Sequence, residues 1–281
     1  MKVFRLKKDL QKQLSQLKKD GKSIGFVPTM GALHQGHLAL VEAALKDNDV
    51  TVVSIFVNPT QFDNPEDLKK YPRTFDTDVN LLQKLSNSIL IFKPDSLDFY
   101  DGNVESQQFN FDGLELEMEG KHRPGHFDGV GTVVKKLFET VQPDRGYFGE
   151  KDFQQLQIIK KLVAKEKMPI EIVPIPIYRE ADGLAMSSRN KRLEPVYRTA
   201  APFIYQVLKQ ARLIFQNQTP EATKAFVNQS IAAHPFLELE YFEIADEKTL
   251  KPIKTKINSN KYRGFIVVYA GEVRLIDNIK L

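Results

Sequence analysis

The stretch SIGFVPTMGALHQGHLALVEAALKDN, residues 23–48, decides the fold class. Its first five residues form an apolar run that stops at Pro28, and apolar residues recur at helical spacing over residues 37–48. These features predict a strand, a glycine-containing loop and a helix. In an open parallel sheet, ligands bind at the carboxyl ends of the strands, and a helix N-terminus attracts phosphate. We therefore expect a nucleotide at the loop over residues 28–37.

The same pattern recurs further along the chain. An apolar, β-branched run over residues 51–58 is followed by a helical stretch near 74–85 and by a second apolar run over 88–92. Two further helix-and-strand pairs are expected at residues 126–149 and 150–175. Strands that alternate with helices predict an α/β fold with a Rossmann-like, doubly wound parallel sheet.

A smaller domain is predicted after residue 176. Prolines at positions 174 and 176 interrupt the pattern, and the polar segment READGLAMSSRNKR follows at 179–192. Beyond it lie helical segments at about 195–216 and 220–233, then three apolar runs, of which the last two have hairpin character. We therefore divide the chain into a Rossmann-like nucleotide-binding domain, 1–176, and a smaller C-terminal α+β lid domain, 177–281.

The net charge of +4 is concentrated in the first 22 residues, which hold eight Lys or Arg residues against Asp9 and Asp20. The rest of the chain is therefore net −2. Leucines recur at helical spacing in this basic segment, at positions 6, 10, 14 and 17, and the Asp20-Gly21 pair predicts the end of a helix. The basic residues are predicted to form the solvated face of an amphipathic helix rather than a nucleic-acid site.

The absence of cysteine excludes a disulfide framework, a thiolate zinc site and a cysteine nucleophile. The N-terminus lacks the apolar stretch of a signal peptide, and no run of about 18 apolar residues occurs in the chain. We therefore expect a cytoplasmic protein with no membrane partner.

Two glycines and two histidines determine the chemistry of the loop over residues 28–37. Gly31 and Gly36 permit the backbone to approach a ligand closely. His34 and His37 are spaced so that both imidazoles can face one phosphate chain, with a charge that is tunable near neutral pH. The flanking strand and helix favour this interpretation over a turn with two surface histidines.

The segment HQGH resembles the His-x-Gly-His signature of the nucleotidylyltransferase superfamily, and PTMGALHQGH as a whole resembles the pantothenate synthetase family. The similarity continues through FVNPTQF (56–62), YPRTFDTD (71–78), RPGHFDGVGTVV (123–134), FGEKDFQQLQ (148–157) and GLAMSSRN (183–190). The resemblance implies an ATP-dependent ligase that condenses pantoate with β-alanine through a pantoyl adenylate and releases AMP and pyrophosphate. It also implies magnesium and a homodimer.

The resemblance assigns ATP binding to three segments. They contain Met30, Gly31, Ala32, Leu33, His34, Gln35, Gly36 and His37, then Gly149, Glu150, Lys151 and Asp152, and finally Tyr178, Met186, Ser187, Ser188 and Arg189. Catalytic roles are implied for His34, His37, Lys151, Ser187, Ser188 and Arg189. A bound phosphate would also explain Lys151 itself, because a cation in the first turn of a helix is otherwise unfavourable. The family usually carries a smaller aliphatic residue in place of Tyr178, so a packing role against adenine is not carried over.

The resemblance implies that Gln61 and Gln155 bind pantoate, and neutral amides suit this role because they do not repel a carboxylate. Gln155 lies four residues after Lys151, a spacing expected to place both on one helical face. Asp78 is implied as a magnesium ligand, and a surface acid is the alternative. The segment RPGHFDG (123–129) is expected to shape a turn and the start of a helix, and contact with the site through His126 or Arg123 is the alternative.

The segment Arg179–Arg192 is expected to be a mobile lid, because its small residues offer little side-chain area to bury. Two rival functions stay open. One is a nucleotidylyltransferase that transfers AMP or CMP to a phosphate, although glutamines rather than extra cations occupy the substrate positions. The other is an RNA-binding protein that keeps a synthetase-like fold without its chemistry, although the PTMGALHQGH, GEKD and MSSR segments are intact.

Overall fold

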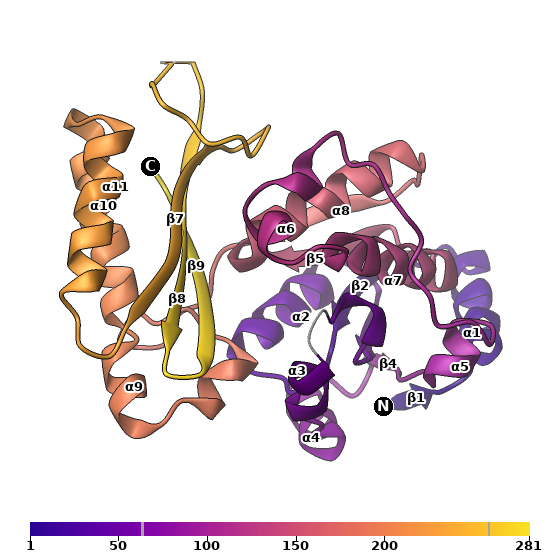
Figure 1. Cartoon of the computed structure of the whole chain (residues 1–281). Helices are drawn as coiled ribbons and strands as arrows, with labels where there is room; N and C mark the ends of the chain where they lie inside the picture. The colour runs from indigo at the N-terminus through magenta and orange to yellow at the C-terminus, as the bar shows by residue number, and fades with distance from the viewer. Residues whose placement is uncertain (63–64, 258) are drawn as a thin grey trace. The chain divides into compact units, whose positions relative to one another are not determined.

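The structure is a computed structural model that describes residues 1–62, 65–257 and 259–281. The chain forms two compact units (Figure 1). Unit 1 comprises residues 1–150 and 155–176, and unit 2 comprises residues 151–154 and 177–281. The segment Lys151–Gln154 thus groups with the C-terminal part of the chain, which the sequence did not lead us to expect.

Unit 1 is built on a parallel sheet of six strands. In chain order the strands are β1 (Lys2–Phe4), β2 (Ile24–Thr29), β3 (Val50–Ile55), β4 (Leu90–Phe92), β5 (Arg145–Gly149) and β6 (Glu171–Ile175). Their order in the sheet is β1-β4-β3-β2-β5-β6, so the chain adds strands on one side of β2 and then on the other. This order confirms the Rossmann-like doubly wound prediction. The carboxyl ends of β2 and β5 lie at the switch point, where such sheets bind ligands.

Helices cover both faces of this sheet (Figure 1). Up to β6, the helices are α1 (Lys7–Lys19), α2 (Gln35–Asp47), α3 (Pro65–Lys70), α4 (Phe75–Leu85), α5 (Ser96–Phe99), α6 (Met118–His122), α7 (His126–Val141) and α8 (Phe153–Lys165), with short 3-10 helices η1 (Pro59–Gln61), η2 (Leu114–Leu116) and η3 (Glu150–Asp152). On one face, α2 and α4 share a core with Val27 and Val53. On the other face, the ring centroid of Phe26 lies 6.2 Å from that of Phe138 on α7. The side chains of Phe26 and Val27 point to opposite faces of the sheet because side chains alternate along a strand.

Unit 2 contains an antiparallel sheet of three strands, in the order β7 (Glu238–Asp246), β8 (Tyr262–Ala270) and β9 (Val273–Lys280). Its helices are η4 (Ser188–Arg192), α9 (Pro195–Ala200), α10 (Phe203–Asn217) and α11 (Pro220–Ala232). Residues of α10 and α11 form one core with those of β8 and β9. The predicted α+β character and the closing hairpin are both confirmed.

Two expectations about helices were wrong in detail. The single helix predicted over 195–216 is two helices, because Pro202 has no N–H group with which to continue α9. Leu6 lies before α1 and is 50% exposed, so it does not join Leu10 and Leu14 on the buried face of that helix. The chain before Leu6 forms the short edge strand β1, which carries no periodic signal.

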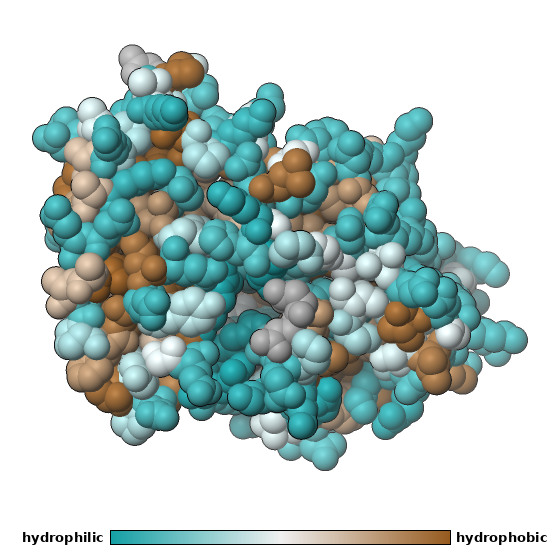
Figure 2. Space-filling model, in the orientation of Figure 1, coloured by the Kyte–Doolittle hydropathy of each residue, from teal (hydrophilic) through white to brown (hydrophobic). Residues whose placement is uncertain are grey.

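Polar side chains cover most of the face shown in Figure 2, with apolar side chains visible between α10 and β7, where the core of unit 2 reaches the surface. Among the described residues, no helix is long and apolar enough to cross a membrane.

Candidate functional site

The loop after β2 adopts a backbone conformation that is rare for residues other than glycine. Gly31 has a φ of +82° and Ala32 a φ of +51°, both in the left-handed region. Asp78, the fourth residue of α4, stabilises this turn because its Oδ1 accepts from the N–H of Leu33 at 2.8 Å and its Oδ2 from that of Ala32 at 3.0 Å. The carboxylate is only 1% exposed, so these bonds form away from water. Asp78 therefore shapes the loop that leads into α2.

Asp78 is also the residue that the resemblance implies as a magnesium ligand. The hydroxyl of Thr74 also donates to Oδ1 of Asp78, at 3.1 Å, so both carboxylate oxygens face hydrogen-bond donors. Magnesium requires near-octahedral oxygen ligands and keeps several waters. Within the described residues, no group of three or more His, Cys, Asp or Glu side chains could hold a metal ion. Asp78 is therefore a loop anchor in this structure, and its role as a magnesium ligand stays a prediction.

The structure brings His34 and His37 together at the N-terminus of α2. Their ring centroids lie 4.0 Å apart with an angle of 31° between the planes, and both side chains are half-buried. His34 caps the helix, and its carbonyl oxygen accepts from the N–H of His37 at 2.8 Å and from that of Leu38 at 3.0 Å. Gln35 between them is exposed. Two adjacent imidazoles at a positive helix end form a suitable site for a phosphate chain.

The side-chain amide of Gln61 has one defined orientation. The N–H of Thr60 lies 3.4 Å from Oδ1 of Asn58, and because a backbone N–H only donates, Nδ2 of Asn58 must point the other way. Nδ2 donates to Oε1 of Gln61 at 3.1 Å and to the carbonyl of Gly129 at 3.4 Å. Nε2 of Gln61 is left facing the sulfur of Met30, a weak acceptor, at 3.4 Å. Gln61 therefore offers an N–H donor to an oxygen of a ligand.

Sequence reasoning missed Tyr100, which supports this amide chain. Its hydroxyl donates to Oδ1 of Asn58 at 2.5 Å, and the residue is only 3% exposed. Burial raises the pKa of the Tyr100 hydroxyl, so it remains a proton donor at neutral pH. No motif marks Tyr100 in the sequence, because 42 positions separate it from its partner.

The RPGHFDG segment starts a helix, as predicted, and it also holds the backbone of Gln61. Nδ1 of His126 lies 2.8 Å from the carbonyl oxygen of Gln61, and Nη2 of Arg123 donates to the same oxygen at 3.4 Å. Gly129 allows α7 to pack directly on η1, since a Cβ atom there would lie 2.2 Å from the carbonyl oxygen of Thr60. These residues position Gln61 through its main chain.

The second predicted ATP segment divides between the units. Gly149 ends β5 and Glu150 begins η3, both in unit 1, and β5 is the neighbour of β2 in the sheet. Lys151 and Asp152 belong to unit 2, where Nζ of Lys151 lies 3.9 Å from Oδ1 of Asp152. The expectation that Lys151 and Gln155 share one helical face was wrong, because Lys151 lies in η3 and α8 begins only at Phe153.

The third ATP segment follows a short hairpin in unit 2. The N–H of Met186 donates to the carbonyl of Tyr178 at 3.0 Å, and Tyr178 is 43% exposed. Ser187 caps η4, where its Oγ accepts from the N–H of Arg189 at 3.3 Å, and Ser188 is only 5% exposed. Next to it, Asn190 donates from Nδ2 to the carbonyl of Ala185, at 3.1 Å. Hydrogen bonds within unit 2 thus fix the backbone on both sides of the Ser187–Arg189 segment.

Charged side chains also contact one another within and beside residues 179–192, the segment expected to be a mobile lid. Nη2 and Nη1 of Arg198 pair with Glu180 at 2.6 Å and Asp182 at 2.7 Å. Nδ2 of Asn190 also donates to Oε1 of Glu180, at 2.7 Å. The mobile lid stays a prediction, which hydrogen exchange with and without Mg·ATP tests. Composition alone did not reveal that charged residues would hold the segment.

A sequence model of the family described as pantoate-beta-alanine ligase matches residues 2–280. The chain belongs to the pantoate-β-alanine ligase family. It is 55% identical over 281 residues to the pantothenate synthetase of Christiangramia forsetii and 54% identical over 279 residues to that of Flavobacterium psychrophilum. These alignments cover 100% and 99% of this chain and 99% of each relative.

Solved structures of the pantoate-β-alanine ligase family share the fold over the whole chain. The pantothenate synthetase of Thermus thermophilus is 39% identical, with a TM-score of 0.91 and coverage of 100% of this chain and 99% of its own. The pantoate-β-alanine ligase of Francisella tularensis, solved in complex with beta-gamma ATP and β-alanine, is 37% identical. Its TM-score is 0.81, with coverage of 100% and 97%.

Proposed function

We propose that this protein is an ATP-dependent ligase that joins the carboxylate of pantoate to the amine of β-alanine. Membership of the pantoate-β-alanine ligase family over residues 2–280 carries this proposal. The paired imidazoles at the N-terminus of α2 support it, since they suit a polyphosphate. The complex of the Francisella tularensis relative with beta-gamma ATP and β-alanine is consistent with the same two ligands here.

The reaction proceeds in two half-reactions. A carboxylate oxygen of pantoate attacks the α-phosphorus of ATP, and the bond between that phosphorus and the oxygen bridging to the β-phosphorus breaks, which releases pyrophosphate. The amine of β-alanine then attacks the pantoyl carbonyl carbon, loses a proton and expels AMP. A carboxylate is already a nucleophile, so the enzyme has to align the reactants and stabilise phosphate charge.

The proposed ATP-binding residues supply that charge stabilisation. His34 and His37 contact the phosphate chain at the positive N-terminal end of α2, and the loop from Met30 to Leu33 lies along the nucleotide. Lys151 and Arg189 of unit 2 stabilise the charge that develops on pyrophosphate. The other proposed ATP-binding residues of the second and third segments are Gly149, Glu150, Asp152, Tyr178, Met186, Ser187 and Ser188.

Pantoate is proposed to bind Gln61 and Gln155 of unit 1. The orientation of Gln61 requires that it donate from Nε2, so its partner on pantoate is an oxygen acceptor such as a hydroxyl or carboxylate oxygen. Magnesium is the expected counter-ion of the ATP phosphates, and Asp78 is the residue proposed to hold it, directly or through water.

A pyrophosphate-release assay tests the function against its rivals. We expect release that depends on ATP and pantoate, and formation of AMP when β-alanine is added. Release with a phosphorylated co-substrate instead of pantoate would indicate a nucleotidyl transfer enzyme, and RNA binding without release would indicate the RNA-binding rival. A homodimer stays a prediction, which sedimentation at micromolar concentration tests.

A further inference from the structure

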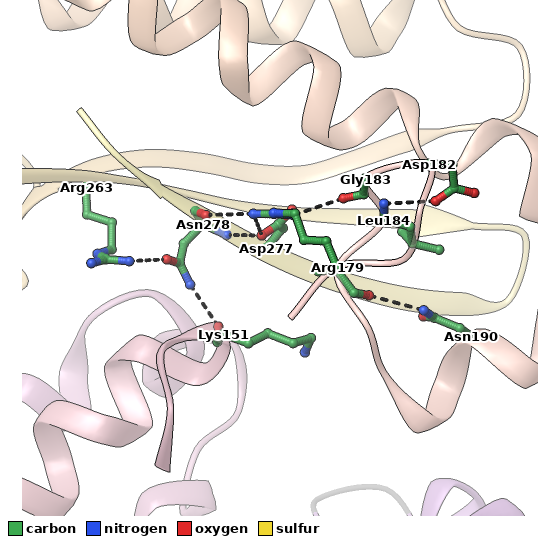
Figure 3. Close-up of polar contacts among 10 residues, drawn as sticks. Lys151, Arg179, Asp182, Gly183, Leu184, Asn190, Arg263, Asp277 and Asn278 are labelled. Atoms are coloured by element: carbon green, nitrogen blue, oxygen red, sulfur yellow. Dashed lines mark hydrogen bonds and ion pairs between the residues drawn. The ribbon is translucent and has the colours of Figure 1, made fainter. Parts of the chain in front are cut away.

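Two adjacent residues of β9, Asp277 and Asn278, are polar and yet only 6% and 2% exposed. Side chains alternate along a strand, so the two serve opposite faces of the sheet in unit 2. Burying a polar group is unfavourable unless it is hydrogen-bonded. Both residues have hydrogen-bond partners (Figure 3). Asp277 accepts from Arg179, in the hairpin that leads to Ser187, and Asn278 donates to Lys151, in the second ATP segment.

Asp277 holds the hairpin that leads to Ser187. Arg179 donates to it in a bidentate manner, from Nη1 to Oδ2 at 2.6 Å and from Nη2 to Oδ1 at 3.0 Å. The same Nη1 donates to the carbonyl of Gly183 at 3.1 Å, on the far side of the hairpin turn. The guanidinium also stacks on Tyr205, 3.6 Å from the ring centroid. One carboxylate thereby orients the whole hairpin on the sheet.

Asn278 holds the backbone of Lys151 on the opposite face. Its Nδ2 donates to the carbonyl of Lys151 at 2.8 Å, and its Oδ1 accepts from Nη1 of Arg263 at 2.5 Å. Because a guanidinium only donates and a carbonyl only accepts, the amide has a single orientation. Arg263 is itself fixed by Glu247, at 2.9 Å from Nε, and by the ring of Phe153, 3.8 Å from the guanidinium.

Stability alone is a weak explanation for this arrangement. Replacing a buried ion pair by apolar residues of similar volume is often neutral or stabilising. Buried polar networks that are fully hydrogen-bonded instead define a unique geometry. In unit 2, two consecutive residues of β9 fix the position of the Lys151 backbone relative to the hairpin before Ser187.

We propose that Asp277 and Asn278 are positioning residues for adenylate formation, which place Lys151 and the Ser187–Arg189 segment in one frame for the phosphates of ATP. The inference rests on the proposed function. It predicts that their loss impairs the chemical step of pyrophosphate release more than it impairs pantoate binding, since Gln61 and Gln155 belong to unit 1.

The test is Asn278→Asp, which keeps an acceptor for Arg263 and removes the donor to Lys151. The matched control is Arg274→Met, on the same strand as Asn278, which breaks the ion pair of Arg274 with Glu240 of β7 (2.6 Å). We expect Asn278→Asp to lower kcat for pantoate-dependent pyrophosphate release by roughly 10–100-fold, with KM for pantoate changed less than about twofold. The control should keep the wild-type kcat.

Thermal melting shows whether each variant is folded at the assay temperature. A folded Asn278→Asp with wild-type kcat overturns the inference and leaves the proposed function intact, whereas a wild-type protein that releases no pyrophosphate overturns the proposed function. If Asn278→Asp does not fold, Asp277→Asn is the second variant, because it weakens the bidentate pair with Arg179 at nearly constant volume. A wild-type kcat in folded Asp277→Asn likewise overturns the inference.

Discussion

Replacing Asp78 by alanine tests the assignment of this carboxylate as the anchor of the loop after β2. The substitution leaves the buried N–H groups of Ala32 and Leu33 without their acceptor. Each buried donor left unsatisfied costs about 1–3 kcal/mol, so the variant should lose roughly 2–6 kcal/mol of unfolding free energy. That is a large fraction of the ~5–15 kcal/mol by which natural domains are stable.

Asp78→Asn distinguishes the acceptor role from simple packing. The amide keeps one oxygen for one N–H group but turns its NH₂ toward the other, so we expect a loss of roughly 1–3 kcal/mol. Asp76→Asn is the control, because Asp76 is an exposed acid in the same first turn of α4. Its loss removes only a favourable interaction with the helix dipole, about 0.3–1 kcal/mol.

Urea denaturation measures these free energies, and activity as a function of magnesium concentration tests the rival role. If Asp78 anchors the loop, Asp78→Ala should lose the most unfolding free energy, Asp78→Asn less and Asp76→Asn the least. The magnesium concentration that gives half-maximal activity should be unchanged in the folded Asp78→Asn protein. Wild-type stability combined with a shifted magnesium midpoint would refute the anchor role and support Asp78 as a metal ligand.

Three further outcomes are expected. His37→Ala should fold normally and lose about 2.7–4 kcal/mol of transition-state stabilisation, measured as kcat for pyrophosphate release, since it removes one preorganised donor; a folded variant with wild-type kcat would contradict this role. Gly129→Ala should lower both thermal stability and pantoate affinity, because its Cβ would lie 2.2 Å from the carbonyl oxygen of Thr60; calorimetry showing unchanged pantoate affinity would argue against it. Hydrogen bonds from Ser23 lower the pKa of Asp49 from 3.8 to about 2, so its contribution to stability is present above pH 3.8 and lost as the pH falls through 2. The stability difference between wild type and Asp49→Asn should therefore shrink over that range in acid titrations, and a constant difference would exclude the linkage.

The order of the units along the chain, the parallel sheet and the nucleotide loop were predictable because their signals are local. A five-residue apolar run before Pro28, two glycines and a helical period are all contained within residues 23–48. Repetition of that pattern predicted the doubly wound sheet, and right-handed crossovers restrict its topology. The short spacing between His34 and His37 likewise predicted that one helix end presents both rings.

The sequence by itself thus determined the fold class, the family and the residue types of the candidate site. Only the tertiary structure decided what those residues contact, because hydrogen-bond partners far apart in the chain leave no periodic signal. Asp78 anchors amides 45 and 46 positions away, Tyr100 reaches Asn58 across 42, and Asn278 reaches Lys151 across 127. A carboxylate in a motif does not reveal which backbone N–H groups it will meet, because only the packed chain brings those groups to it and buries them.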